Sequence, residues 1–185
     1  GQAFGTFALE RDRRRIVVGH DLRTYSPRLA RSFIEGLVAA GQHVVDIGCV
    51  LTPTLYFAQV HLTCPAGVMI TASHNPWRWN GFKYKPDYGG SASPEIVAEI
   101  EAPLPDLVGR DVPRMDIAEA KKAGMVQTFD ARTPYLAHLG RLVDLERLKA
   151  AGLNVAYDAM YGTGAGYFNE LLDGGKKPSS IEPLR

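Results

Sequence analysis

The alternation of strand and helix signals over residues 15–71 is the feature that most constrains the fold. Three short runs rich in Val and Ile are typical of buried strands, and they lie at residues 15–19, 43–48 and 67–71. Between them, Ser26 followed by proline and Thr52 followed by proline are typical of helix beginnings, with Ser26 as the N-cap. Strand, helix, strand, helix, strand predicts a three-layer α/β/α domain with a mostly parallel mixed sheet.

A second group of elements completes the first predicted domain, residues 1–130. Residues 82–85 alternate apolar and basic side chains, which predicts a half-buried strand. A helix is expected over residues 95–101, and the prolines that follow end it. Residues 103–130 hold prolines and scattered charges. We interpret them as the end of the domain and a link that contains one short helix.

The remainder, residues 131–185, is expected to form an incomplete second α/β domain. Thr133 opens a long amphipathic helix that Gly152 ends, and residues 153–157 predict a strand. A glycine-rich turn and a short helix through Leu172 follow. One strand with two helices buries too little apolar surface to be stable alone. We therefore expect poor order beyond Leu172.

Charge and composition exclude several classes of partner. The formal net charge is +1, so no global field attracts nucleic acid or a membrane surface. No apolar run approaches the roughly 18 residues of a membrane span. The cysteines, Cys49 and Cys64, show no metal-ligand or redox spacing and are expected to be buried free thiols. We expect a cytoplasmic protein, and the sequence leaves its oligomeric state open.

Polar residues follow the first and third predicted strands and carry the candidate chemistry. Arg23 comes shortly after the first strand, and Ser73 comes directly after the third. Ligands of open α/β sheets bind outside the carboxyl ends of the strands. Because parallel strands end at the same edge, Arg23 and Ser73 are expected to belong to one site.

The run at residues 71–76, of sequence Thr-Ala-Ser-His-Asn-Pro, fits phosphoryl chemistry. Ser73 can present a hydroxyl at the sheet edge, while neighbouring backbone N–H groups form an anion-binding nest. His74 and Asn75 add donors, and Lys83 supplies a positive charge. An ordinary turn is the alternative, because serine and asparagine before a proline are common loop residues.

Taken with other motifs, this run resembles the active-site signature of the α-D-phosphohexomutases, the family of phosphoglucomutase and phosphomannomutase. The resemblance covers nearly the whole chain in the family's order. It rests on residues 71–76 and 80–83 (Asn-Gly-Phe-Lys), residues 19–26 (Gly-x-Asp-x-Arg-x-x-Ser), residues 4–6 (Phe-Gly-Thr, similar to the opening motif) and residues 158–166, similar to the start of the family's second domain.

The resemblance implies a mutase that interconverts hexose 1-phosphate and hexose 6-phosphate. A phosphoserine at Ser73 would give its phosphoryl group to a sugar phosphate. A catalytic hexose bisphosphate would form, and its other phosphate would return to the serine. An oxygen of the phosphoserine at Ser73 would be one ligand of a Mg²⁺ ion. The sugar could be glucose, mannose or glucosamine.

The resemblance also implies roles for the neighbours of the serine. His74 would act beside the nucleophile, and Asn75 and Asn80 would bind phosphate. Lys83 would transfer a proton or clamp charge. Arg23 would hold the same neighbourhood from the other loop.

Several family motifs are absent from the sequence. It lacks the metal-binding Asp-Gly-Asp-x-Asp-Arg, the sugar-selecting Gly-Glu-x-Ser-Gly and the phosphate-binding Arg-x-Ser-Gly-Thr. The stretch of residues 7–15 is also too short for the helix that the family places after its opening motif. We therefore expect the 185-residue chain alone to be inactive.

Other interpretations stay open at this level. The chain could be a non-catalytic phosphate-binding fragment of such an enzyme, or a serine-dependent phosphatase. The glycines of residues 162–166 are better explained by a tight turn than by nucleotide binding, because their spacing is wrong. Trp77 and Trp79 could pack over the sheet edge or form a lip on the sugar site.

Overall fold

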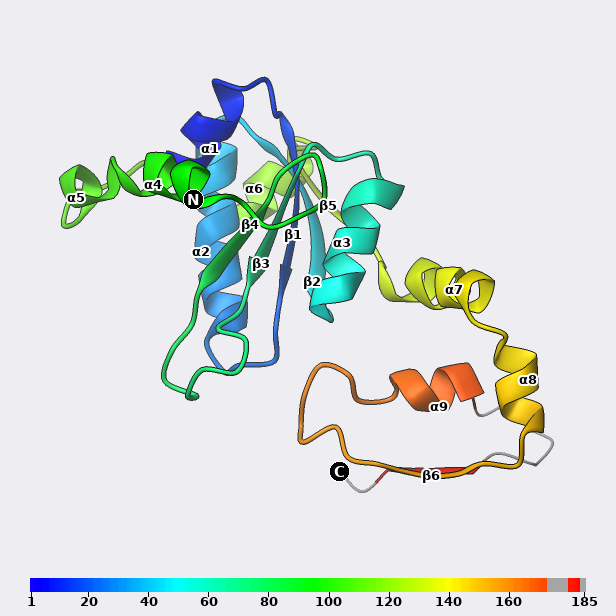
Figure 1. Cartoon of the computed structure of the whole chain (residues 1–185). Coiled ribbons are helices and arrows are strands. Elements are labelled where there is room, and N and C mark those ends of the chain that lie inside the picture. Colours follow the sequence, from blue (N-terminus) through cyan, green and yellow to red (C-terminus); the bar gives the residue numbers. More distant parts are fainter. Residues whose placement is uncertain (173–179, 184–185) are drawn as a thin grey trace. The chain divides into compact units, whose positions relative to one another are not determined.

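The computed structural model describes residues 1–172 and 180–183. The chain divides into two compact units, Gly1–Phe129 and Asp130–Arg185 (Figure 1). Across the described ranges, no helix is long and apolar enough to cross a membrane.

The first unit is built on a five-stranded sheet with strand order β4-β3-β1-β2-β5. β3 and β2 flank β1 in parallel and β5 extends β2 in parallel, whereas β4 is antiparallel to β3. The mostly parallel mixed sheet predicted from the sequence is therefore confirmed. The strands are β1 Arg15–His20, β2 His43–Cys49, β3 Ala66–Ile70, β4 Phe82–Lys85 and β5 Val126–Thr128.

Helices cover both faces of this sheet (Figure 1). One face carries α2 (Ser26–Ala39), with α1 (Gln2–Leu9), α4 (Pro94–Glu101) and α6 (Ile117–Lys122). The other face carries α3 (Thr52–His61), and α5 (Leu104–Leu107) follows α4. The expected three-layer arrangement is confirmed.

The alternation of side chains along β1 explains why both faces are covered. Ile16 and Val18 belong to the core cluster that includes Ile34 and Leu37 of α2, whereas Val17 lies outside it. All three β1 side chains are nevertheless fully buried. Successive strand residues point to opposite faces, so a strand that is apolar throughout needs a helix on each side.

Residues 4–6, which are similar to the family's opening motif, lie within α1, where Phe4 is 2% exposed in the core. Two expectations for the first unit are wrong. The predicted link contains the expected short helix α6, but it also supplies β5, which is three residues long and is defined by its pairing with β2. Cys64 is buried as expected, whereas Cys49 is exposed because it is the last residue of β2, at the edge of the sheet.

The second unit differs from its predicted pattern in two ways. The long helix expected after Thr133 is broken at Val143, whose backbone is extended, and Asp144 caps a new helix by accepting from the N–H of Arg147. A second strand pairs in parallel with the predicted one. Its elements are α7 Arg132–Leu142, α8 Leu145–Ala150, β6 Asn154–Tyr157, α9 Tyr167–Leu172 and β7 Ser180–Pro183. Of the segment expected to be poorly ordered, residues 173–179 and 184–185 lie outside the described residues.

Candidate active site

The loops after β1 and β3 meet at the carboxyl edge of the sheet. His20 and Ile70 are paired at the ends of these parallel strands. The N–H of Asp21 donates to the carbonyl of Ile70 at 3.1 Å, so the two chains stay side by side as they leave the sheet. The guanidinium of Arg23 then reaches the carbonyl oxygen of Ser73 at 3.0 Å. The expectation that Arg23 and Ser73 share one edge is confirmed.

Asp21 joins the two loops through its carboxylate. Its Oδ1 accepts from the Ser26 hydroxyl at 2.5 Å and from the N–H of Arg23 at 3.0 Å. Its Oδ2 accepts from the Thr71 hydroxyl at 2.7 Å and lies 3.3 Å from Nε of Arg23. Burial acts to raise the pKa of Asp21, but these hydrogen bonds and the positive charge of Arg23 outweigh it and lower the pKa. The carboxylate is therefore held in its ionised form.

Arg23 binds the backbone of the serine loop, the segment of residues 71–81 between β3 and β4. Its Nη1 donates to the carbonyls of Pro76 at 2.9 Å and Trp79 at 3.1 Å. Its Nη2 donates to the carbonyls of Ser73 at 3.0 Å and Asn75 at 2.7 Å. These bonds use the four N–H groups of the two terminal nitrogens, while Nε faces the carboxylate described above. Arg23 thus has no donor left for a phosphate in this arrangement.

Ser73 stands at the exposed turn of this loop. Its φ of 55° lies in the left-handed region, which is uncommon for a residue other than glycine. The Ser73 N–H donates to Oγ1 of Thr71 at 3.0 Å. Its own Oγ lies 3.3 Å from Nδ1 of His74, a separation at which the hydroxyl can donate to a neutral imidazole. The serine hydroxyl is therefore presented to solvent with a histidine beside it.

The expected nest of free backbone amides is wrong in part. The Ser73 N–H is occupied by Thr71, and the Asn75 N–H donates to the carbonyl of Ala72 at 3.0 Å. Local turn bonds satisfy these donors because a tight loop brings its own acceptors within reach.

Asn80 is also engaged within the protein. Its Nδ2 donates to the Ser26 hydroxyl at 2.7 Å, and its Oδ1 accepts from the N–H of Gly81 at 2.8 Å. The N–H of Thr71 donates to the carbonyl of Gly81 at 2.9 Å and closes the loop. Asn80 therefore makes a loop-closing contact through one N–H of its amide, and its phosphate-binding role stays a prediction.

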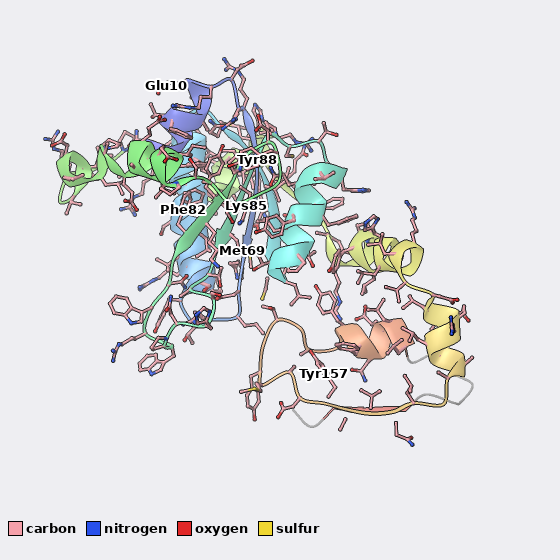
Figure 2. The ribbon with its side chains drawn as sticks, in the orientation of Figure 1. Glu10, Met69, Phe82, Lys85, Tyr88 and Tyr157 are labelled. Atoms are coloured by element: carbon pink, nitrogen blue, oxygen red, sulfur yellow. The ribbon has the colours of Figure 1, made fainter. Side chains whose placement is uncertain are left out.

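Lys83 lies on β4, opposite Met69 of β3. Figure 2 labels Met69 and two other residues of β4, Phe82 and Lys85. Phe82 belongs to the aromatic contacts on the α1 and α2 side, so Lys83 points to the α3 side. Lys85 is on that side too, with its Nζ 4.6 Å from the ring centre of Tyr56 in α3. Across the described residues Lys83 makes no ion pair, and no hydrogen bond joins it to Ser73. Its charge is available, but its proximity to the serine hydroxyl remains a prediction.

The two tryptophans project from the same loop. The Tyr25 hydroxyl donates to the carbonyl of Trp77 at 2.9 Å, and Arg23 binds that of Trp79. The backbone is thus held while the side chains of Trp77 and Trp79 are 78% and 56% exposed. The packing interpretation is therefore wrong, and a lip on the site stays a prediction.

Sequence reasoning did not assign a role in the site to Asp21, Thr71, Ser26 or Tyr25. Asp21 and Ser26 were already within the motif at residues 19–26, but a motif does not say which atoms its residues contact. Thr71 precedes the serine by two residues, and only the folded loop turns its hydroxyl toward both Asp21 and the Ser73 amide. Together these residues form a hydrogen-bonded support for the serine loop: Asp21 accepts from Ser26 and Thr71, and Tyr25 donates to the carbonyl of Trp77.

In the part of the chain that the structure describes, no group of three or more His, Cys, Asp or Glu side chains is placed to hold a metal ion. The metal-ligand assignment of Ser73 stays a prediction that concerns a single oxygen.

Comparison with known proteins identifies the family of this site. Residues 1–106 match the phosphoglucomutase/phosphomannomutase family, alpha/beta/alpha domain I. The chain belongs to this family. The phosphohexomutase serine loop and its support thus lie within the matched domain, with Ser73 at its exposed turn.

Similar phosphohexomutases come from several organisms. The chain is 34% identical over 94% of its length to a phosphoglucomutase of Neisseria meningitidis serogroup B and covers 35% of that protein. It is 36% identical over 89% of its length to the phosphohexose mutases of Xanthomonas campestris pv. campestris and covers 35% of them. A crystal structure of a protein described as a phosphomannomutase from Thermus thermophilus matches 99% of the chain with a TM-score of 0.82 and 34% identity, and the chain covers 40% of it. The chain therefore spans about a third of the length of its curated relatives.

Proposed function

We propose that this chain is the phosphoserine-bearing part of a mutase that interconverts hexose 1-phosphate and hexose 6-phosphate. The observation that carries the proposal is the exposed Ser73 hydroxyl, held at the sheet edge within the domain matched to the phosphohexomutase family. The related proteins are named for glucose, mannose and glucosamine. We therefore propose hexose phosphates as the class of substrate, without choosing among these sugars.

The proposed reaction consists of two phosphoryl transfers, one from Ser73 to the sugar and one from the sugar back to Ser73. The bond between Ser73 Oγ and phosphorus breaks as a bond forms between a sugar hydroxyl oxygen and phosphorus, which gives the bisphosphorylated sugar. In the second half the other phosphate of that sugar returns to Ser73. The sugar hydroxyl loses its proton in the first step, and Lys83 is the proposed proton-transfer group. Phosphoryl transfer depends chiefly on positioning and on charge neutralisation, so a fixed serine is the first requirement.

His74 and Asn75 are proposed to contact the phosphoryl group. His74 lies 3.3 Å from the serine oxygen, and the Asn75 side chain is exposed at the same turn. Asn80 is proposed to act through the loop it closes. Magnesium would neutralise charge on the phosphoryl group, with further ligands from outside the described residues.

The test is Ser73→Ala in the enzyme that contains this chain, assayed with hexose 1-phosphate and catalytic hexose bisphosphate. Turnover is expected to fall by roughly 10⁴-fold or more, because a covalent nucleophile is lost. Ser32→Ala, at an exposed serine of α2, is the matched control and should leave turnover unchanged. Retention of more than about a tenth of wild-type turnover by Ser73→Ala would refute the mechanism.

A second measurement addresses the intermediate. Protein purified from cells is expected to carry a partial mass increment of one phosphate, and peptide mapping should place it on Ser73. Phosphate found only on other residues would contradict the assignment of the nucleophile.

A narrower activity is proposed for the 185-residue polypeptide itself. It spans 35% of the Neisseria relative, and its described residues contain no three-ligand metal group. We expect it to bind phosphate without turnover, because metal and substrate contacts each contribute several kcal/mol to such a reaction. Turnover near the roughly 10 s⁻¹ of a typical enzyme would contradict this expectation.

A further inference from the structure

A single arginine side chain, that of Arg23, holds the backbone of the serine loop. Four of its carbonyl oxygens, those of Ser73, Asn75, Pro76 and Trp79, accept from the two terminal nitrogens of Arg23. All four bonds lie between 2.7 and 3.1 Å. They come from a residue about 50 positions earlier in the chain, so the loop conformation depends on a tertiary contact.

Asp21 in turn fixes the arginine. Its Oδ2 lies 3.3 Å from Nε of Arg23, and the two side chains are 16% and 17% exposed. The same carboxylate accepts the Thr71 hydroxyl, whose oxygen accepts the Ser73 N–H. Asp21 therefore acts on the serine by two routes, one through the guanidinium and one through Thr71.

We propose that Asp21 and Arg23 form a positioning pair that holds the Ser73 loop in its reactive shape, and that Arg23 acts through the loop backbone and not as a phosphate ligand. The proposal rests on the proposed function for its catalytic consequence, whereas its structural claim stands independently. A phosphate ligand needs free N–H donors, and those of the terminal nitrogens are already occupied.

The geometry also explains why an arginine occupies this position. A planar guanidinium presents two donors on each terminal nitrogen in a fixed fork and can bind four carbonyls spread over seven residues. A lysine ammonium has three donors around one atom, so it cannot span the same set. Arg23→Lys keeps the positive charge but loses the clamp, which separates positioning from simple electrostatics.

The first experiment measures the mobility and the solvent exposure of the serine loop. Trp77 and Trp79 are the two tryptophans of the 185-residue chain, so its tryptophan fluorescence reports on this loop. Arg23→Lys, Arg23→Ala and Asp21→Asn are compared with wild type by fluorescence anisotropy and acrylamide quenching. Arg14→Ala is the matched control, because Arg14 is 69% exposed and pairs only with Asp12 among the described residues.

The three loop variants are expected to lower the anisotropy and to raise the quenching constant by about twofold or more, as a local segment opens. Far-UV circular dichroism should stay unchanged, and Arg14→Ala should behave as wild type. If Arg23→Ala lowers the far-UV circular dichroism signal and is therefore partly unfolded, Arg23→Lys supplies the comparison, since it retains the charge beside Asp21. Wild-type anisotropy and quenching in a folded Arg23→Lys variant would overturn the proposal.

The second experiment separates positioning from phosphate binding in the enzyme that contains this chain. With hexose 1-phosphate as substrate, Arg23→Lys is expected to lower kcat by about 10²-fold, the cost of misplacing a reacting group, and to leave KM within about threefold. A KM raised by more than tenfold with kcat retained would show that Arg23 binds the substrate and would overturn the proposal. If Ser73→Ala keeps its activity while Arg23→Lys still loosens the loop, the proposed function fails and the clamp stands.

Discussion

Replacement of Phe4 by alanine tests the packing that supports β4, the strand that carries Lys83. Phe4 extends from α1 and is 2% exposed. Its ring centre lies 5.2 Å from that of Phe82 and 4.9 Å from that of Tyr84, the two residues that flank Lys83. It also contacts Phe33 of α2 at 5.9 Å. The mutation therefore removes the side chain that joins two helices to β4.

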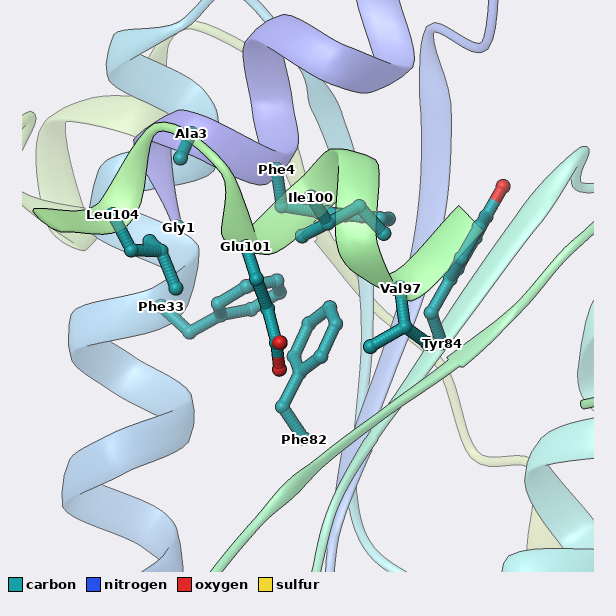
Figure 3. A pocket seen from close by; sticks show the side chains of 10 residues that line it. All are labelled: Gly1, Ala3, Phe4, Phe33, Phe82, Tyr84, Val97, Ile100, Glu101 and Leu104. Carbon is teal, nitrogen blue, oxygen red and sulfur yellow. The ribbon is translucent and has the colours of Figure 1, made fainter. Parts of the chain in front are cut away.

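The magnitude follows from the surroundings of the ring. Truncation of a buried phenylalanine costs about 3–5 kcal/mol. Phe4 borders an open pocket of about 370 Å³ that Phe33, Phe82 and Tyr84 also line (Figure 3). Because the ring already borders this open space, its truncation encloses a smaller new cavity, and we expect the lower half of the range, about 3–4 kcal/mol.

The assay is urea unfolding followed by far-UV circular dichroism. With a slope of about 2 kcal/mol per M, the loss shifts the midpoint of the transition by roughly 1.5–2 M toward lower urea. Val60→Ala, at a position of α3 that is 71% exposed, is the control and should shift the midpoint by less than about 0.3 M. A shift below about 0.5 M for Phe4→Ala would show that the aromatic contacts do not stabilise the domain as argued.

Three further predictions use other features of the first unit. Gly67→Ala is expected to lower the free energy of unfolding by about 1–3 kcal/mol in urea titrations, because its Cβ would lie 2.5 Å from Oε1 of the buried Gln59; an unchanged midpoint would contradict this. The folded-state pKa of Asp21 is lowered, so its ionised form stabilises the fold above the ordinary pKa of 3.8 and that contribution is lost as the pH falls through the folded value. The stability gap between wild type and Asp21→Asn, measured by thermal unfolding, should therefore narrow below about pH 3.8, and a constant gap would refute the assignment. Cys49 is exposed and should react first with a thiol reagent, while Cys64, 5% exposed, should react only on unfolding; equal rates in the folded protein would contradict the packing.

The composition of the strands was sufficient to predict the central part of the fold. β3 is apolar throughout and β1 is apolar between Arg15 and His20, and such strands need helices on both faces, so the α/β layers follow from local pattern alone. Parallel pairing then places the ends of the strands at one edge, which is why the proximity of Arg23 and Ser73 could be predicted. The sequence pattern was informative wherever burial dictates residue type.

Elements without such a pattern could not be predicted. β5 is three residues long and is defined by its pairing with β2, and the break at Val143 depends on Asp144 as a helix cap. Ser26 was expected as an N-cap, yet it is the first residue of α2, Tyr25 is the N-cap, and the Ser26 hydroxyl is bonded to Asp21. Local propensity predicts that this hydroxyl caps the helix, whereas in the folded protein it donates to Asp21 of the preceding loop.

The sequence by itself determined which two loops form the candidate site, because the motif at residues 71–76 and the positions after β1 and β3 are local features. It did not determine what those residues contact. Only the tertiary structure turned Arg23 toward four backbone carbonyls, used the side chain of Asn80 for loop closure and made Asp21 the centre of the network. The physical reason is that hydrogen bonds are directional and short-ranged, so the partner of a polar group is decided by which atoms the packed strands bring within about 3 Å.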